Sequence, residues 1–246
     1  MVGRVFSVLD AFSTSRRTLR LAEIADSAGL PRPTSMRIIR QLVEHGALVR
    51  HGMEYEVGPR MWHLGLLAAV QSDLRDVAAP FLNDLHAATR ATVHLAVREG
   101  DRALYLDRLA GSTSVPVVSR VGETLPMHCT GVGKILLAYA PDDVRRRVMD
   151  RLSRQTAHTL TNRSVLTAQL DEARRRGFAT TTEEMTLGAC SVAVPVLADG
   201  SAVAALGVVV PRLGRDTARF VAAMTVAARG VGRMLDREVL MRNGNT

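Results

Sequence analysis

The sequence of 246 residues has few of the features that mark secreted, zinc-binding or membrane-spanning proteins. Its two cysteines are too few for a disulfide framework or for a structural zinc site. No charged-then-apolar leader follows Met1, and the longest apolar run, residues 202–211, is about half the length that a membrane helix requires. We therefore expect a cytoplasmic protein with reduced thiols, no membrane segment, no metal and no cofactor.

Lysine is nearly absent from the chain, because Lys134 is the only one among the 32 basic residues. Arginine suits bidentate contacts with phosphate, although so uniform a bias is also typical of coding preference. The 24 acidic residues leave a formal net charge of +8, which favours a polyanionic partner without requiring one. The length allows two domains, and a hydrophobic content of 47% allows each domain its own core.

The N-terminal residues carry the pattern of a winged helix-turn-helix. Apolar side chains at helical spacing predict three helices, over residues 4–13, 21–28 and 33–44. Gly29 is placed to end the second helix in a left-handed conformation, and Pro33 suits the first turn of the third. Two short β-like runs, residues 47–50 and 54–57, flank a glycine turn and predict a hairpin. We expect this DNA-binding domain to span residues 1–59.

The third helix has an apolar face with Ser35, Ile38 and Ile39, and an opposite face with arginines. A recognition helix needs short or basic side chains near its N-terminus, which enters the major groove. A solvated charged face is the alternative, but the break at Gly29 and the following hairpin favour DNA binding. The residues expected to contact DNA are Arg32, Pro33, Thr34, Ser35, Met36, Arg37 and Arg40 in the helix, and Arg50 and His51 in the hairpin.

The charge of this region is modest for a DNA-binding module. Residues 1–60 contain nine arginines and six acidic residues, a net charge of +3. One copy would therefore bind weakly at physiological salt, which predicts a dimer that contacts two half-sites.

From residue 58 onward the pattern changes to a mixture of helices and hairpins. A linker helix is predicted at residues 60–72. Strands are predicted at residues 93–97, 103–109, 115–121, 178–183, 191–197 and 202–210. Helices are predicted at residues 73–90, 131–140, 142–152, 165–176 and 215–236. Hairpins outnumber strand–helix–strand units, so we expect residues 73–246 to form an α+β domain with a largely antiparallel sheet.

Residues 126–136 contain Gly-Val-Gly-Lys, which is similar to part of a phosphate-binding loop. His128 stands where that motif requires its first glycine, and Ile135 stands where it requires a magnesium-binding Ser or Thr. The nucleotide interpretation therefore fails. What remains is a loop of small residues at the start of a helix, whose free amides can receive a carboxylate. A helix start that binds nothing is the alternative.

Catalytic chemistry has little support in the sequence. Cys129 beside His128, and Glu183 beside Glu184, are the residues that an enzyme would use, but sequence neighbours usually point apart. His94, within an apolar strand, is more often a core histidine than a ligand. We predict no catalytic residue, and we rank a sensor-domain enzyme and a protein–protein module below a DNA-binding regulator.

Several segments, taken in their order and spacing, resemble the IclR family of bacterial transcriptional regulators over essentially the whole chain. They are LAEIA at 21–25, GLP at 29–31, YEVGPR at 55–60, YLDR at 105–108, GETLPMHCTGVGK at 122–134, RGFA at 176–179, EE at 183–184 and VAVPV at 192–196. The resemblance implies a winged helix-turn-helix, a linker helix and a GAF-like effector domain. It also implies operator binding as a dimer or a pair of dimers, controlled by a small molecule that is frequently a carboxylic or aromatic acid.

The same resemblance places the effector in a cup on the sheet of the second domain. Thr181 and Thr182 stand where many relatives carry acidic residues, and Ser191 aligns with a frequent cysteine. These hydroxyls beside apolar walls would suit a modest acid or alcohol. The residues expected to contact the effector are Met127, Cys129, Thr130, Gly131, Val132, Thr181, Glu183, Ala189, Ser191, Gly207 and Val209.

Overall fold

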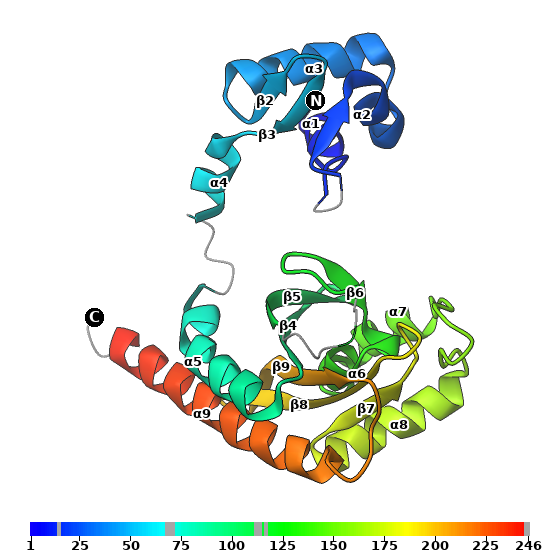
Figure 1. Cartoon of the computed structure of the whole chain (residues 1–246), viewed down its shortest axis with the longest axis vertical. Coiled ribbons are helices and arrows are strands. Elements are labelled where there is room, and N and C mark those ends of the chain that lie inside the picture. The colour runs from blue at the N-terminus through cyan, green and yellow to red at the C-terminus, as the bar shows by residue number, and fades with distance from the viewer. Residues whose placement is uncertain (14–15, 67–71, 111–114, 116–117, 244–246) are drawn as a thin grey trace. The chain divides into compact units, whose positions relative to one another are not determined.

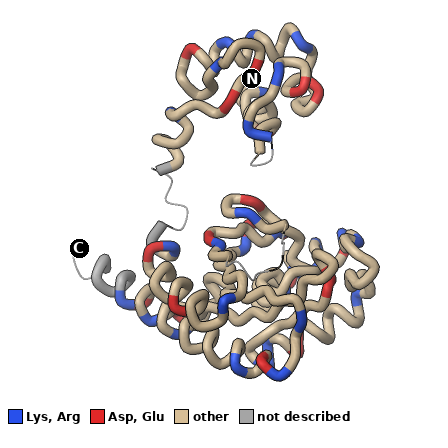
Figure 2. Tube along the Cα trace, viewed as in Figure 1, with Lys and Arg blue, Asp and Glu red and all other residues tan. Residues whose placement is uncertain are grey.

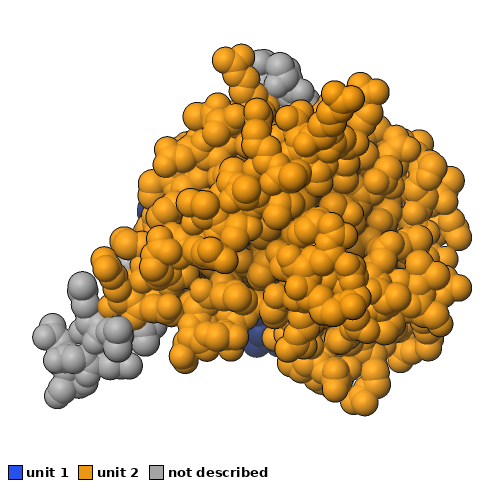
Figure 3. Space-filling view, turned by 90° about the horizontal axis from the view of Figure 1, so that it is seen from below, with its two compact units in different colours: residues 1–70 blue, residues 71–246 orange. Residues whose placement is uncertain are grey.

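The computed structural model describes residues 1–13, 16–66, 72–110, 115 and 118–243, and it consists of two compact units (Figure 1). Figure 3 shows one face of the larger unit in orange. Unit 1 comprises residues 1–70 and unit 2 comprises residues 71–246. Each unit contains its own cluster of buried apolar side chains. Among the described helices, none combines the length and the apolar character needed to cross a bilayer.

Unit 1 is a bundle of helices with a small antiparallel sheet. Its elements are α1 (Val2–Leu9), β1 (Thr18–Arg20), α2 (Leu21–Ala28), α3 (Arg32–Glu44), β2 (Leu48–His51), β3 (Glu54–Val57) and α4 (Pro59–Leu66). The strand order is β1-β3-β2. The three helices and the hairpin predicted from the sequence are present. No pattern in the sequence predicted β1, because only one of its three side chains, Leu19, is buried.

The turn between α2 and α3 depends on Gly29. This residue has φ of +63°, and its amide and that of Leu30 donate to carbonyls in the last turn of α2. A left-handed C-terminal residue of this kind favours glycine, which has no Cβ to strain. Pro33 then lies in the first turn of α3, where its missing N–H costs no helical hydrogen bond. Ile24, Ile38 and Ile39 pack together beneath this turn.

Unit 2 contains a six-stranded sheet with strand order β6-β5-β4-β9-β8-β7, in which every pairing is antiparallel. Its strands are β4 (Thr92–Glu99), β5 (Arg102–Leu109), β6 (Thr124–Pro126), β7 (Ala179–Thr182), β8 (Cys190–Ala198) and β9 (Ser201–Val210). Its helices are α5 (Ser72–Thr89), α6 (Gly131–Ala138), α7 (Asp142–Met149), α8 (Arg163–Arg176) and α9 (Thr217–Asn243). The prediction of an α+β fold with an antiparallel sheet is confirmed.

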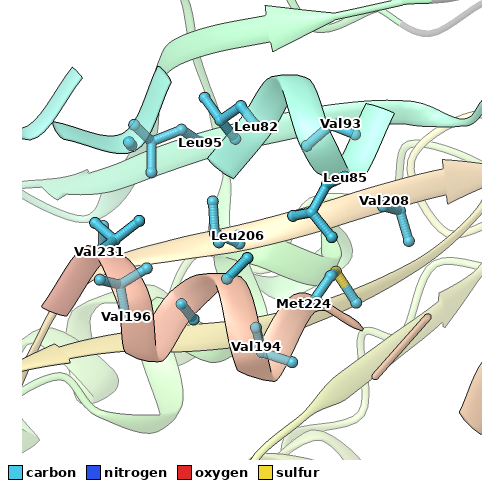
Figure 4. Close-up of a cluster of buried hydrophobic side chains, with 14 of the residues drawn as sticks. Leu82, Leu85, Val93, Leu95, Val194, Val196, Leu206, Val208, Met224 and Val231 are labelled. Atoms are coloured by element: carbon cyan, nitrogen blue, oxygen red, sulfur yellow. The ribbon is translucent and has the colours of Figure 1, made fainter. Parts of the chain in front are cut away.

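The two faces of this sheet carry different side chains. One face presents branched residues such as Leu95, Val194 and Leu206, which pack against α5 and α9 (Figure 4). The other face presents Ala96, Ala193 and Ala205, which pack with α6 and its neighbouring helices. Because successive side chains of a strand alternate between faces, the small residues share one side and allow α6 to approach closely.

The prediction of a strand at residues 115–121 is wrong wherever the structure describes these residues. Residues 115 and 118–121 are not in a strand, and residues 116 and 117 lie outside the described part of the chain. Pairing with β5 begins only where Gly122 donates its amide to the carbonyl of Tyr105. The short strand β6 follows from there. Of the predicted linker helix, residues 67–71 also lie outside the described chain.

Candidate functional site

The outer face of α3 is a row of exposed side chains with unpaired positive charge. Arg32, Pro33, Met36, Arg37 and Arg40 are exposed, and basic residues recur along this helix (Figure 2). Within the described chain, none of the three arginines forms an ion pair. Their guanidinium groups are therefore available to a phosphate or to the edge of a base. Thr34, also in the first turn, is half-buried.

The DNA contact predicted for Ser35 is wrong. Its side chain is fully buried, and its hydroxyl has no hydrogen-bond partner among the described residues. Ser35 shares the inner face of α3 with Ile38 and Ile39, as helical spacing requires. A hydroxyl on that face does not reach a phosphate outside the unit.

The hairpin residues Arg50 and His51 are exposed but are held by neighbours on the hairpin. Arg50 donates from Nε to the carbonyl of Gly52 at 2.8 Å, and its guanidinium lies 5.9 Å from the ring centre of Tyr55. His51 Nε2 lies 2.7 Å from Glu56 Oε1. These contacts fix both side chains at the surface of the hairpin. Their contact with DNA stays a prediction.

A pocket opens on the α6 face of the sheet in unit 2. It holds about 470 Å³ of space outside the protein atoms, a volume that includes solvent at its open side. Several residues predicted from the sequence line it together. They are Cys129, Thr130, Gly131, Val132, Thr181, Ala189, Ser191, Gly207 and Val209.

Glycine and threonine place the start of α6 against the sheet. Thr130 caps the helix, since its hydroxyl accepts from the amide of Gly133 at 3.2 Å and donates to the carbonyl of Pro126 at 3.1 Å. A Cβ on Gly131 would lie 2.5 Å from Ser191 Oγ. A Cβ on Gly207 would lie 2.8 Å from Val132 Cγ1. The pocket wall therefore requires both glycines.

Met127 and Glu183, two predicted effector contacts, do not line this pocket, and their contact with an effector stays a prediction. Met127 is completely buried in the core with α6, α7 and α8. Glu183 has φ of +55°, and its carboxylate accepts from the amide of Gly188 at 2.6 Å and lies 3.3 Å from His158 Nε2. It closes the 183–188 loop.

Two strand residues that the sequence analysis did not assign to the pocket, His94 and Tyr105, supply part of its polar lining. Ser119 Oγ lies 2.8 Å from His94 Nε2, and the rings of His94 and Tyr105 meet edge to face at 5.0 Å between centroids. Burial, with a smaller contribution from Arg108, lowers the pKa of His94 to about 3, so its imidazole is neutral. Side chains alternate between the two faces of a strand, and this alternation puts His94 and Tyr105 on the face with the small residues. The sequence pattern could therefore have assigned both to the pocket.

The remaining polar lining consists of hydroxyl groups. Tyr105 is hydrogen-bonded to the side chain of Thr130, and burial raises the pKa of Tyr105 well above its usual range. Thr181 Oγ1 and Ser191 Oγ lie 2.6 Å apart. Among the described residues that line the pocket, none has a charged side chain at neutral pH. The pocket thus offers neutral hydrogen-bonding groups beside apolar walls.

Cys129 is unsuited to nucleophilic chemistry. Its thiol is buried 3.5 Å from the sulfur of Met185, and burial, with the charge of Glu184, raises the pKa of Cys129 to about 12. The protonated thiol is a poor nucleophile. In the part of the chain that the structure describes, no group of three or more His, Cys, Asp or Glu side chains could hold a metal ion.

Lys134 forms a buried ion pair under the pocket. Its Nζ lies 2.6 Å from Glu184 Oε1 and 2.8 Å from Gln169 Oε1. Burial lowers the pKa of Lys134 and raises that of Glu184, while their mutual attraction opposes both shifts. The lysine of the Gly-Val-Gly-Lys segment therefore joins α6 to the 183–188 loop and is not available to a phosphate.

Comparison with known proteins gives relatives that share nearly the whole chain. It is 34% identical over 216 residues to the probable transcriptional regulator SauR of Cupriavidus necator, covering 85% of this chain and 84% of the relative. It is 30% identical over 243 residues to the Pca regulon regulatory protein of Pseudomonas putida, covering 95% and 83%. A crystal structure of an IclR homologue from Microbacterium hydrocarbonoxydans complexed with 4-hydroxybenzoate has a TM-score of 0.89 and 31% identity, covering 94% of this chain and 97% of that one.

Two family models account for both units. Residues 1–52 match the IclR helix-turn-helix domain, and residues 67–233 match the C-terminal domain of the bacterial transcriptional regulator IclR. The relatives named above are regulators, so the chain is a regulator and not an enzyme. The chain belongs to the IclR family of bacterial transcriptional regulators, with an N-terminal helix-turn-helix domain and a C-terminal ligand-binding domain.

Proposed function

We propose that the protein is a cytoplasmic regulator that binds its operator as a dimer, or as a dimer of dimers, with an affinity set by a small molecule. The effector is a small carboxylic or aromatic acid that binds in the pocket at the start of α6. The observation that carries this proposal is the pocket with neutral polar lining, in a chain that also has an exposed arginine face.

The DNA-binding part of the proposal rests on α3. Arg37 and Arg40 lie on its exposed face, and neither has an acidic partner in the described structure. The net charge of +3 over residues 1–60 is small, and salt weakens phosphate contacts steeply. Two copies that contact two half-sites overcome this weakness, which supports a dimer.

The effector part rests on the chemistry of the pocket. Leu125, Val132 and Val209 supply apolar surface for a hydrocarbon body, beside a few polar groups that could orient it. The similar protein from Microbacterium hydrocarbonoxydans binds 4-hydroxybenzoate. A hydroxylated aromatic acid has the mixture of polar ends and flat apolar body that this lining complements.

Regulation requires that the effector bind two arrangements of the protein with different affinity. The pocket and the α5–α9 layer share the same strands, so a change in the pocket acts on α5 through the sheet. Helix α5 begins at Ser72, directly after the segment that joins the two units. We place the transmission path in residues 60–90.

Footprinting on the DNA that flanks the gene, with and without a panel of small acids, tests this function. We expect a protected site whose affinity falls steeply as salt rises and changes at least several-fold with one acid. Binding that is insensitive to salt would favour the protein–protein alternative. A protected site that no acid affects would contradict the proposed effector class.

A further inference from the structure

An irregularity between β4 and β5 directs Arg108 toward the pocket face of the sheet. Leu95 pairs with Asp107 and Ala96 pairs with Tyr105, so Leu106 is an extra residue in β5. A bulge of this kind reverses the alternation of side chains beyond it. Tyr105 and Arg108 therefore share a face. In a regular strand, two residues that are three positions apart would lie on opposite faces.

The neighbours of Arg108 confirm this direction. Asp107 points to the other face, where its Oδ2 lies 4.0 Å from Nε of Arg75 on α5. Leu109 also points there and packs against the core with α5 and α9. On the pocket face, the residue directly opposite Arg108 is His94, which lines the pocket.

Arg108 carries a buried group that lacks a partner. Its Nε is shielded from solvent and has no hydrogen-bond partner in the described structure, and no described acidic side chain forms an ion pair with it. Arg108 is not among the residues that line the pocket, but its charge lies close enough to His94, which does line it, to contribute to the lowered pKa of that imidazole. Asp107, its neighbour in sequence, is turned toward Arg75. A shielded donor on a charged group is costly unless a ligand satisfies it.

We propose that Arg108, together with His94 and Ser119, forms the carboxylate-receiving end of the effector pocket. The effector is then an organic acid whose carboxylate pairs with the guanidinium, while its body lies against the apolar wall that includes Val132 and Val209. This inference rests on the proposed function and names the chemical group that the site selects. It differs from recognition by the amides at the start of α6, which needs no arginine.

The chemistry of the three groups fits a carboxylate. An arginine presents planar donors that match the two oxygens of a carboxylate. The neutral imidazole of His94 and the hydroxyl of Ser119, 2.8 Å apart, can share one proton and leave another to donate to the ligand. Glu184, the buried carboxylate near the pocket, is already paired with Lys134 and does not compete for Arg108.

Calorimetric titration of the full chain with matched acids and amides tests the assignment. The probes are 4-hydroxybenzoate, benzoate and butyrate, each beside its primary amide. We expect the wild-type protein to bind at least one acid ten-fold or more tightly than its amide. Arg108→Gln should reduce the affinity for that acid to the level of the amide. Arg98→Gln, which removes an exposed arginine at the far end of β4, should keep the wild-type preference.

The outcomes separate the inference from the proposed function. Wild-type protein that binds acid and amide equally, or Arg108→Gln protein that keeps the preference, overturns the role of Arg108 while the pocket still binds its ligand. Wild-type protein that binds none of the probes overturns the acid effector and the assignment together. Unchanged amide binding shows that the variant pocket is intact. If Arg108→Gln does not fold, Arg108→Met, with the same expected loss, decides the question.

Discussion

At the scale of single residues, His94 is a neutral base enclosed in the middle of the sheet. Its pKa falls to about 3 in the folded protein, against 6.5 for the free side chain, so the unfolded chain binds a proton that the folded chain does not between these values. The contribution of the neutral imidazole to the free energy of unfolding is therefore fully present above pH 6.5 and is lost as the pH falls toward 3. We expect the free energy of unfolding to fall by about 2 kcal/mol from pH 7 to pH 5 on account of this residue.

Differential scanning calorimetry at the two pH values measures this loss. His94→Gln should remove most of the pH dependence assigned to His94. His63→Gln, the same substitution at an exposed histidine in the other unit, is the control. Equal pH dependence in wild type and His94→Gln would show that folding does not change how readily this imidazole binds a proton.

Arg37 and Arg40 carry the DNA-binding prediction at the same scale. Substitution of either by alanine should weaken operator binding by about 1–3 kcal/mol if the side chain contacts a base edge. Arg98→Ala removes the same charge from the other unit and serves as the control in a gel-shift titration at fixed salt. Wild-type affinity in both α3 variants would refute the assignment of α3 as the recognition helix.

At the scale of elements, the Lys134–Glu184 pair joins α6 to the 183–188 loop. Thr159 strengthens the junction by donating to the carbonyl of Glu184 at 2.7 Å. Removing one partner of a buried pair leaves an uncompensated charge, so Lys134→Met should lower the free energy of unfolding by about 3–5 kcal/mol. The double variant Lys134→Met with Glu184→Leu should recover much of the loss, because it removes both charges.

Thermal melting followed by circular dichroism compares the three proteins. The single variant should melt well below the wild type, and the double variant should lie between them or above. A single variant that melts with the wild type would mean that water reaches the pair and screens it.

The elements show what the sequence predicted and what it did not. The ends of α2 and α3 follow from local residues, Gly29 and Pro33, so both helices were predictable. The facing of Arg108 depends on an extra residue in β5, which appears only when two strands are paired. Likewise, the exclusion of Glu183 from the pocket results from a left-handed loop that no spacing rule indicates. Local signals thus predicted the helices, and non-local pairing determined the polar lining.

At the scale of the whole molecule, the dimer prediction concerns the spacing of two copies of α3 on DNA. Two recognition helices contact the same side of a duplex when their half-sites are one helical turn apart, about 10 base pairs. Inserting about 5 base pairs between the half-sites of a footprinted operator should therefore reduce affinity at least ten-fold, and inserting about 10 should restore part of it.

Gel-shift titration of the three operators, with sedimentation to determine the mass of the complex, measures this effect. An insertion of equal length outside the site is the control. Equal affinity for all three spacings would mean that a single copy provides the binding, and the dimer proposal would then be wrong.

The sheet of unit 2 determines how a conformational change at the pocket can be transmitted to the helices on its other face. A single strand, β4, presents His94 to the pocket and, one residue on either side, Val93 and Leu95 to the layer of α5 and α9. Close-packed interiors resist compression, so a strand displaced from one side must displace what lies on its other side. If an effector occupies the pocket, we expect it to act on α5 and α9 through this single strand, without contacting either helix.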